Sequence, residues 1–388
     1  MRPLKLVVVG TLASNPYAGM AWMHMQIVVG LRRLGHDVYY FETTSTWPYD
    51  PLRQTNVCDS DYAIPYLARV AEHFGIGEHW AYRRSFSDKE WFGLSRTKAV
   101  DLLEHADAVL SIAGATRFAE EGLKVGYLVY FGTDPVYHEI AFFNGEENIS
   151  KLIEEHDVFV TYGENIGNPD CVIPPLPKLR CKTRQPVLID LWESGPPMKE
   201  VFTTVGNWKQ SGHDIKYQGE TYYWSKHHEF LKFIDLPQRI NEPIELAIGL
   251  NNLDPSDGKL LHLNGWRLVD AHAFTGDPWP YRDYVRASRG EFTVAKDQNV
   301  RLRSGWFSER SACYLAAGRP VITQDTGFGS FLPTGEGLFA FNTMEEIVTA
   351  FYSIKTDYER HSLAARAIAE EYFRAETVLA KLLDDLGL

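Results

Sequence analysis

The sequence predicts an α/β protein with two domains, each built on a parallel β-sheet. With 388 residues, the chain is long for one domain and suits two. Residues 4–41 contain an apolar run, a loop, a helix pattern and a second apolar run, which is the order of a β-loop-α-β unit. Residues 290–341 show the same order and add a glycine-containing turn. In open parallel sheets, the loops that follow the strands bind ligands.

The composition excludes several classes of protein. Apolar residues make up 45% of the chain and aromatic residues 13%, enough for two packed cores. No apolar run is long enough for a membrane span, and residues 4–9 are too few for the core of a signal peptide. The net charge of −12 argues against a general nucleic-acid binder. The four cysteines lack the spacing of a metal site, so we expect reduced thiols in a cytoplasmic protein.

The first half of the chain begins with a strand over residues 4–9, whose continuous apolar character fits a buried parallel strand. A loop over 10–19, a helix over 20–34 and a strand over 37–41 follow it. Gly10 is not followed by the rest of a G-x-G-x-x-G fingerprint. We therefore do not expect a nicotinamide or flavin site.

Residues 43–92 are rich in aromatic side chains and irregular in pattern. They form either an acceptor pocket, since aromatic faces stack on sugars and planar groups, or core beneath long loops. We then expect a helix over 97–104 and three strands, over 108–110, 125–131 and 157–161. Asp134 follows the second of these strands, where it would bind acceptor hydroxyls or act as a base in an inverting reaction. As the start of an Asp-Pro turn it needs no function at all.

The proline-rich stretch 173–177 is stiff and extended, and we place the domain boundary near it. Beyond it we expect strands over 201–205, 244–249 and 265–269, and helices over 224–234, 280–287, 344–354 and 361–386. The first of these helices carries His227, His228 and Glu229. Adjacent helical residues point in different directions and the spacing is not H-E-x-x-H, so we expect no zinc site there.

The segment around residue 305 has the features of an anion site. Ser304, Gly305 and Ser308 precede a helix pattern over 310–317, so free backbone N–H groups and the positive end of the helix dipole face outward. Three arginines add positive charge: Arg301, Arg303 and Arg310. The alternative is an ordinary helix start beside surface arginines.

Residues 308–322 resemble the donor-binding segment of GT-B glycosyltransferases of the family-4 type. In that family a helix ending in A-x-G-x-P-V-I presents its N-terminus to the diphosphate of a nucleotide sugar, and residues 316–322 here read AAGRPVI. Arg310 is in place, but Cys313 stands where relatives have a glutamate that holds the ribose. The resemblance implies that the ribose contact passes to Glu309 or is lost.

The N-terminus resembles the same family. Residues 19–24, GMAWMH, parallel G-G-x-x-x-H, with Ala18 at the first glycine, and residues 35–38, GHDV, parallel G-H-x-V. The resemblance places Gly19 near the donor phosphate or sugar and His24 near the reacting centre, unless His24 is only packed between the domains. We assign three neighbouring residues to the acceptor side of the site: Thr11, Asn15 and Trp22.

Residues 206–212 resemble, more loosely, the G-R-x-x-x-K-G loop whose basic residues hold the diphosphate. Asn207 replaces the arginine, and the lysine comes early, at Lys209. Lys209 is therefore the candidate phosphate contact, or else a solvated lysine. Lys226 and Lys296 are further candidates for this phosphate contact.

As a whole, the resemblance implies an α/β protein of GT-B fold, with two Rossmann-like parallel-sheet domains facing each other across a cleft and a C-terminal helix returning to the first domain. We divide the chain into an acceptor domain, 1–180, a nucleotide-sugar domain, 181–362, and a returning segment, 363–388. The implied activity is transfer of a sugar, with retention and without a metal, from a nucleotide-diphosphate sugar of UDP, GDP or dTDP type to an acceptor hydroxyl.

The expected catalytic residues are His24, Asp134 and Arg310. The expected donor contacts are Gly19, Gly206, Asn207, Lys209, Lys296, Arg303, Ser304, Gly305, Trp306, Phe307, Ser308 and Glu309. Two other functions stay open: a nucleotide-sugar 2-epimerase on the same fold, whose set of acidic and histidine residues we cannot place, and a degenerate GT-B binding protein, which Cys313 and Asn207 favour.

Overall fold

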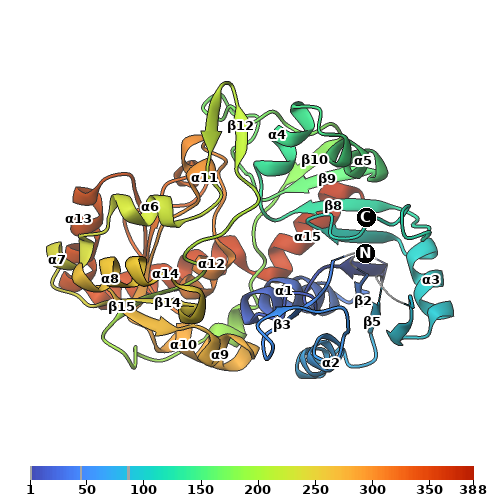
Figure 1. The fold of residues 1–388 in the computed structure, drawn as a ribbon, viewed down its shortest axis with the longest axis horizontal. Helices are drawn as coiled ribbons and strands as arrows, with labels where there is room; N and C mark the ends of the chain where they lie inside the picture. Colours follow the sequence, from blue (N-terminus) through green and yellow to red (C-terminus); the bar gives the residue numbers. More distant parts are fainter. Residues whose placement is uncertain (1, 44–45, 85–87) are drawn as a thin grey trace.

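The computed structural model describes residues 2–43, 46–84 and 88–388, so parts of the aromatic stretch 43–92 lie outside the described residues. Figure 1 shows two lobes, one built by the first half of the chain and one by the second. Both chain ends lie on the first lobe. No helix in the described part of the chain is long and apolar enough to cross a bilayer.

The first lobe is built on an eight-stranded sheet in the order β10-β9-β8-β7-β1-β2-β5-β6. All neighbouring strands are parallel except β5 and β6. The central strand β1 reads KLVVV and is buried after its first residue, as expected for a strand covered on both faces. The strands are β1 (Lys5–Val9), β2 (Asp37–Glu42), β5 (Trp80–Arg83), β6 (Trp91–Gly93), β7 (Ala108–Ile112), β8 (Leu128–Gly132), β9 (Val158–Thr161) and β10 (Leu179–Lys182).

In the described part of this lobe, helices and a small hairpin flank the sheet. The helices are α1 (Ala18–Arg33), α2 (Ala63–His73), α3 (Arg96–His105), α4 (Tyr137–Phe143) and α5 (Glu147–Glu155), and the hairpin pairs β3 (Tyr49–Asp50) with β4 (Thr55–Asn56). Helix α1 follows the loop after β1, and Trp22 of this helix packs against Trp279 of the second lobe.

The second lobe is built on a six-stranded parallel sheet in the order β15-β14-β11-β16-β17-β18. Its strands are β11 (Phe202–Val205), β14 (Ile244–Ile248), β15 (Arg267–Asp270), β16 (Gly290–Thr293), β17 (Val321–Gln324) and β18 (Leu338–Phe341). Its helices are α6 (His227–Lys232), α7 (Leu236–Arg239), α8 (Pro255–Leu263), α9 (His272–Thr275), α10 (Pro278–Ala287), α11 (Asp297–Arg301), α12 (Glu309–Ala316), α13 (Met344–Thr356) and α14 (Tyr358–Ile368). A hairpin of β12 (Ile215–Tyr217) and β13 (Glu220–Tyr222) projects from it.

The chain crosses between the lobes later than the proline-rich stretch suggested. Ile173 and Leu176 are buried in a core of the first lobe, with Ile140 and Ile153, so this stretch packs there instead of forming a linker. Strand β10 then adds to the first sheet, which makes it, and not β9, the last strand of that half. The crossing follows β10 and runs over residues 183–201.

The second crossing breaks the helix expected over 361–386 into two. Helix α14 ends in a single π-helical turn, Ala369–Phe373, and α15 (Ala375–Leu386) begins after Arg374. The break allows the chain to pair with the first crossing: Val187 N–H donates to the Phe373 carbonyl at 2.7 Å, and Ala375 N–H donates to the Val187 carbonyl at 2.9 Å. Helix α14 packs against α12 in the second lobe, so the return begins after residue 373 and not at residue 363.

Helix α15 docks on the first lobe by packing its apolar face against α1. Leu379 and Leu383 are fully buried in the core that also contains Ile27 and Leu31 of α1. The two helices approach closely at Gly30, where an added Cβ would lie 2.5 Å from Leu379 Cδ1. A residue with a side chain at position 30 would therefore push the helices apart.

We predict that Leu379→Ala lowers the free energy of unfolding by about 2–5 kcal/mol, because it leaves a cavity between α1 and α15. The matched control is Leu363→Ala in α14, since Leu363 is 66% exposed and its loss should cost about 0.5 kcal/mol or less. Urea unfolding of the two variants measures both values. Equal values would contradict the docking of α15.

Candidate functional site

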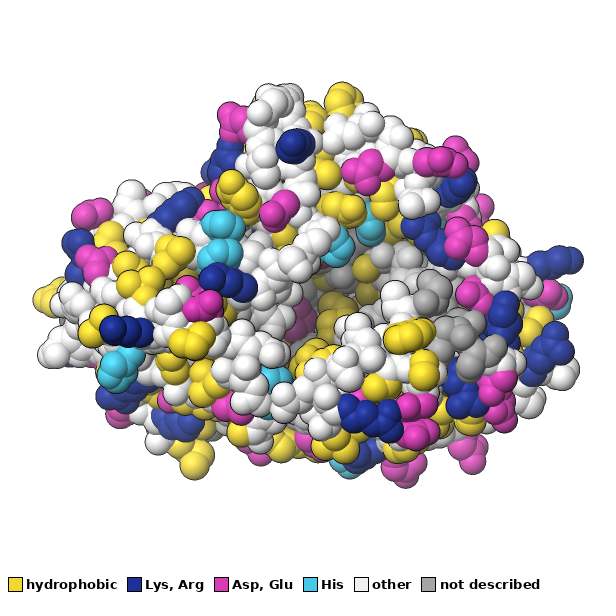
Figure 2. All heavy atoms as spheres, in the orientation of Figure 1, with side chains coloured by type: hydrophobic (Ala, Val, Ile, Leu, Met, Phe, Trp, Pro, Cys, Tyr) yellow, Lys and Arg dark blue, Asp and Glu magenta, His cyan; other side chains and the backbone are white. Residues whose placement is uncertain are grey.

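A cavity of about 770 Å³ lies between the lobes, where the carboxyl ends of both sheets face each other. Figure 2 shows the molecular surface hollowed at this place. The first lobe contributes the loop after β1 and the residue after β8, and the second contributes the loops after β11, β14 and β15 and the start of α12. Open parallel sheets bind ligands at this edge, so the site lies where the fold class predicts one.

Helix α12 points its N-terminus into this cavity. Ser308 is the N-cap residue, with extended backbone angles, and Ser308, Glu309 and Arg310 all line the cavity wall. The first N–H groups of a helix lack partners within the helix, and they carry the positive end of its dipole. This end of α12 therefore favours an anionic group.

The Arg310 side chain ties this helix start to the second sheet. Its Nε donates to the Glu291 carboxylate at 2.5 Å, and its other nitrogens donate to the Val205 carbonyl at 2.6 Å and the Thr293 hydroxyl at 3.0 Å. Burial opposes the charge of Arg310, but the Glu291 carboxylate together with Tyr281 and Tyr314 holds the pKa of Arg310 above its ordinary value. Arg310 is thus a fixed, permanent positive charge at the cavity wall.

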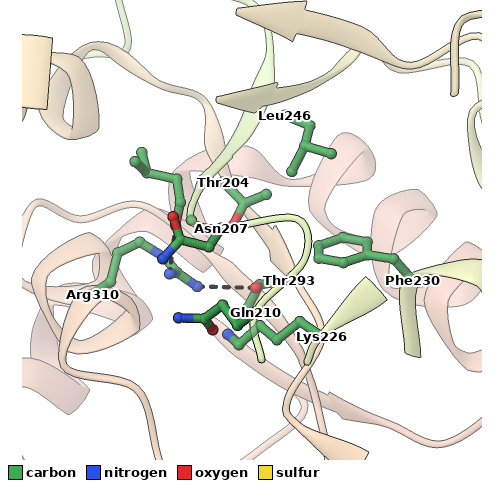
Figure 3. Close-up of a pocket in the computed structure, with 10 residues that line it drawn as sticks. Thr204, Asn207, Gln210, Lys226, Phe230, Leu246, Thr293 and Arg310 are labelled. Carbon is green, nitrogen blue, oxygen red and sulfur yellow. Dashed lines mark hydrogen bonds between the residues drawn. The ribbon is translucent and has the colours of Figure 1, made fainter. Parts of the chain in front are cut away.

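Lys226 is a second cation at the same wall, in a smaller cavity of about 150 Å³ that shares its lining with the main one. In Figure 3, Lys226, Gln210, Asn207 and Arg310 converge on one point. Burial and the neighbouring charges of Arg310 and Lys296 lower the pKa of Lys226 well below its ordinary value. Among the described residues no salt bridge to Lys226 is found, and its side-chain nitrogen lies 5.7 Å from the centre of the Trp306 ring.

The side chains around Lys226 carry charges of both signs. Lys226, Lys296 and Arg310 face the carboxylates of Asp134 and Glu291, and Glu309 adds a third carboxyl group at the start of α12. The Arg310 guanidinium group and the positive end of the α12 dipole favour an anionic ligand at this place.

The other predicted basic residues lie beside this centre or away from it. Lys209 lines the cavity with Gly206 and Asn207, but its ammonium group pairs with Asp257 at 2.6 Å. Lys296 pairs with Asp134 across the gap between the lobes and lies 2.9 Å above the Trp224 ring. Lys296 was predicted to contact the sugar donor and Asp134 to be catalytic. In the structure each of these two residues pairs with the other.

The residues predicted before α12 divide into two groups. Trp306 lines the cavity and donates from Nε1 to the Thr133 carbonyl at 3.0 Å, which joins the lobes. Four others do not line it. Ser304 is buried and bonded to Asn299, Gly305 packs against the backbone of Asn165, Phe307 lies in the core, and Arg303 pairs with Asp170 and Asp325.

On the first lobe, the predicted residues Gly19 and Asn15 line the cavity, but Thr11 and Trp22 do not. Trp22 is fully buried between the lobes, where it packs against Trp192 and Trp279 and donates from Nε1 to the Pro278 carbonyl. It holds the lobes together. An acceptor contact at Trp22 would require the lobes to separate.

His24 lies beneath the loop after β1, fully buried, and does not line the cavity. Its Nδ1 lies 2.7 Å from the Met20 carbonyl, and the Thr11 N–H points to Nε2 at 3.4 Å. These partners suit a neutral ring with its proton on Nδ1. Burial lowers the pKa of His24 to about 4, partly offset by the Met20 carbonyl. Its role in this structure is to fix the loop.

Cys313 and Glu309 form one unit in place of the family glutamate. Cys313 is fully buried and its thiol donates to the Glu309 carboxylate at 3.3 Å, which Gln26 also bonds at 2.8 Å. Glu309, one turn closer to the helix start, lines the cavity. Burial raises the pKa of Glu309 to about 7. Of these two residues, only Glu309 lines the cavity.

Several cavity residues were not singled out from the sequence. They include Tyr162 after β9, Gln185 in the first crossing, Gln210, and the group at the ends of β14 and β15, Gly249, Asn252 and His272. The positions after β14 and β15 follow from the rule on strand ends, but nothing in the side chains marked them. The described residues contain no group of three or more His, Cys, Asp or Glu side chains that could hold a metal ion.

Comparison with known proteins identifies the fold. No protein-family model and no curated protein matches the chain. Among solved structures, it is similar to sucrose-phosphate synthase from Thermosynechococcus elongatus, at 10% identity, a TM-score of 0.57, and coverage of 100% of this chain and 99% of that one. It is also similar to Anabaena HepE in complex with UDP and glucose, at 11% identity, a TM-score of 0.57 and 99% coverage of both chains.

A third similar structure is a glycosyltransferase from Rickettsia africae, at 10% identity and a TM-score of 0.56, with 99% of this chain and 98% of that one covered. These likenesses span both lobes and the C-terminal helix. The chain therefore has the GT-B fold, and the fold class predicted from the sequence is confirmed.

We predict that His24 stays neutral down to about pH 5. The unfolded chain binds a proton at His24 with a pKa of about 6.5, so acid between that pH and about pH 4 favours unfolding, by about 2 kcal/mol at pH 5. Unfolding free energies of wild type and His24→Gln, measured at pH 7 and pH 5, give this difference, and NMR titration of the ring gives the pKa directly. A ring pKa near 6.5 would contradict the buried placement.

Proposed function

We propose that this protein is a glycosyltransferase that moves a sugar from a nucleotide-diphosphate sugar to an acceptor hydroxyl. The observation that carries the proposal is the N-terminus of α12, which points into the cavity between the lobes with Arg310 and Lys226 beside it. A diphosphate supplies the matching negative charge, and helix N-termini bind phosphate well. The similar HepE structure contains UDP and glucose, which supports a donor of this kind.

In the proposed reaction the bond between the sugar and the diphosphate breaks, and negative charge grows on the leaving phosphate oxygen. Arg310, Lys226 and the first N–H groups of α12 surround the place where we locate that oxygen. Groups already fixed where charge develops contribute most to catalysis, because they need no reorganisation. These cations supply the charge that the step needs, so the proposal includes no bound metal ion.

We further propose retention, in keeping with the family resemblance. The acceptor oxygen then bonds to the sugar on the face that the diphosphate leaves, and the acceptor proton passes to the departing phosphate oxygen. We place the nucleoside along the second lobe, with the ribose at Glu309 and the base near Gly249 and His272, because these residues continue the cavity away from the first lobe. The four free thiols fit a cytoplasmic protein.

We predict that one nucleotide of a panel of UDP, GDP, dTDP, ADP and CDP binds in the micromolar to millimolar range, measured by thermal shift and isothermal titration calorimetry. Lys226→Met should weaken the binding of that nucleotide at least 10-fold, because hydrogen bonds to charged groups contribute about 1.5–3 kcal/mol to binding. The control is Lys259→Met, which removes an exposed lysine of the same lobe outside the cavity. Its affinity should match wild type.

No binding by any nucleotide, or equal affinity in Lys226→Met and wild type, would contradict the donor site. Turnover separates the remaining functions. Release of free sugar from the sugar conjugate of the bound nucleotide supports a transferase, since water can replace the acceptor. Binding without turnover would support a degenerate binding protein, and an epimerised nucleotide sugar would support an epimerase.

A further inference from the structure

Two buried polar groups on the first-lobe side of the cavity lack hydrogen-bond partners. They are the Tyr162 hydroxyl and the Gln185 side-chain oxygen, and neither has a partner among the residues that the structure describes. Both residues line the cavity between the lobes. They come from separate parts of the chain, since Tyr162 follows β9 and Gln185 belongs to the first crossing.

The Tyr162 side chain is held firmly and stays protonated. It is 3% exposed, and its ring packs edge-on against Phe131, with ring centres 5.4 Å apart. Burial, with a smaller contribution from the Glu309 carboxylate, raises the pKa of Tyr162 well above its ordinary value. Its O–H group is therefore available as a hydrogen-bond donor at neutral pH.

The Gln185 side chain is also held firmly, but it presents a hydrogen-bond acceptor where Tyr162 presents a donor. It is 1% exposed, and its amide NH₂ donates to the Phe307 carbonyl. This bond uses the amide nitrogen of Gln185 for a contact with the second lobe. The amide oxygen is left as an acceptor without a donor among the described residues. Phe307 and Glu309 lie in the same short segment, so Gln185 and Tyr162 both lie close to the start of α12.

Buried polar groups are nearly always hydrogen-bonded, and an unpaired one destabilises the protein. An unpaired donor and an unpaired acceptor on residues that line one cavity match the hydroxyl groups of a ligand, since a hydroxyl group can both accept and donate a hydrogen bond. A phosphate would match only the donor, because it has no proton to give to Gln185. The cavity therefore offers a hydroxyl-binding place beside its phosphate-binding place.

We propose that Tyr162 and Gln185 form the subsite for ring hydroxyl groups of the transferred sugar, and that the donor carries a hydroxyl-rich hexose. The inference rests on the proposed function, since it assumes a diphosphate at Lys226 and Arg310. A sugar attached to that diphosphate extends from the start of α12 towards the first lobe, where Tyr162 and Gln185 are. The two residues thereby select the sugar, while the second lobe selects the nucleotide.

The test compares each nucleoside diphosphate with its hexose conjugate by isothermal titration calorimetry: UDP with UDP-glucose and UDP-galactose, GDP with GDP-mannose, and dTDP with dTDP-glucose. The measured quantity is the ratio of the two dissociation constants, conjugate over nucleotide. In Tyr162→Phe and in Gln185→Met this ratio should rise about 3- to 10-fold for the preferred conjugate, because one hydrogen bond to the sugar is lost. The affinity for the nucleotide alone should stay at the wild-type value.

Tyr66→Phe is the matched control. Tyr66 is also buried in the first lobe with a hydroxyl group that lacks a partner among the described residues, but it does not line the cavity. Its ratio should equal that of wild type, and the melting temperatures of all variants show whether they fold. An equal ratio in wild type, Tyr162→Phe and Gln185→Met would overturn the subsite, and so would a wild type that binds a nucleotide but none of its conjugates.

The failure of the proposed function gives a different result. If neither nucleotides nor conjugates bind to the wild type, the donor site itself is wrong, and the subsite falls with it. A second outcome is that nucleotides bind and Lys226→Met weakens their binding, but the ratio of dissociation constants is the same in Tyr162→Phe, Gln185→Met and wild type. The donor site then stands and only the sugar subsite is wrong.

Discussion

The buried ion pair between Arg310 and Glu291 is the interaction on which the site depends. It fixes the start of α12 against β16, and the bond from Arg310 to the Val205 carbonyl fixes the end of β11 to the same point. Glu291 is fully buried, so loss of Arg310 would leave a buried carboxylate without its counter-charge, which is strongly destabilising. The same guanidinium group therefore builds the cavity wall and supplies its charge. Structure and function are coupled at this residue more tightly than at Lys226.

The cavity wall differs in charge from the rest of the protein. The whole chain carries a net charge of −12, whereas the cavity wall concentrates cations that burial and mutual repulsion make costly to keep charged. An anion that enters the cavity favours the charged form of Lys226, so binding is linked to proton uptake whenever this lysine is partly deprotonated. Low-dielectric walls focus such a local field, and an acidic protein can thus attract an anionic donor to one place.

Sequence patterns predicted the strands and helices better than they predicted where individual side chains lie. The strand–loop–helix units at both ends of the chain, and the position of α12, follow from periodicity and helix stops. Side-chain placement did not, because it depends on contacts distant in sequence: Trp22 meets Trp279, Arg303 meets Asp170, and Gly305 meets Asn165. The burial of Ile173 and Leu176 in the proline-rich stretch could not be predicted from the local sequence, because their partners are distant in the chain. The β12–β13 hairpin left one sequence signal that we did not use, Gly219 between two short runs, and in the structure Gln218 and Gly219 both have the positive φ of a tight two-residue turn.

The pairing of Val187 with Phe373 and Ala375 brings the two chain crossings together at one point between the lobes. Two strands of chain bonded side by side resist twisting far more than one, but they still allow bending. Both chain connections therefore pass between the lobes as one bonded pair. Any separation of the lobes must also break the contacts that join them elsewhere: Trp306 with Thr133, Lys296 with Asp134 and Trp22 with Trp279.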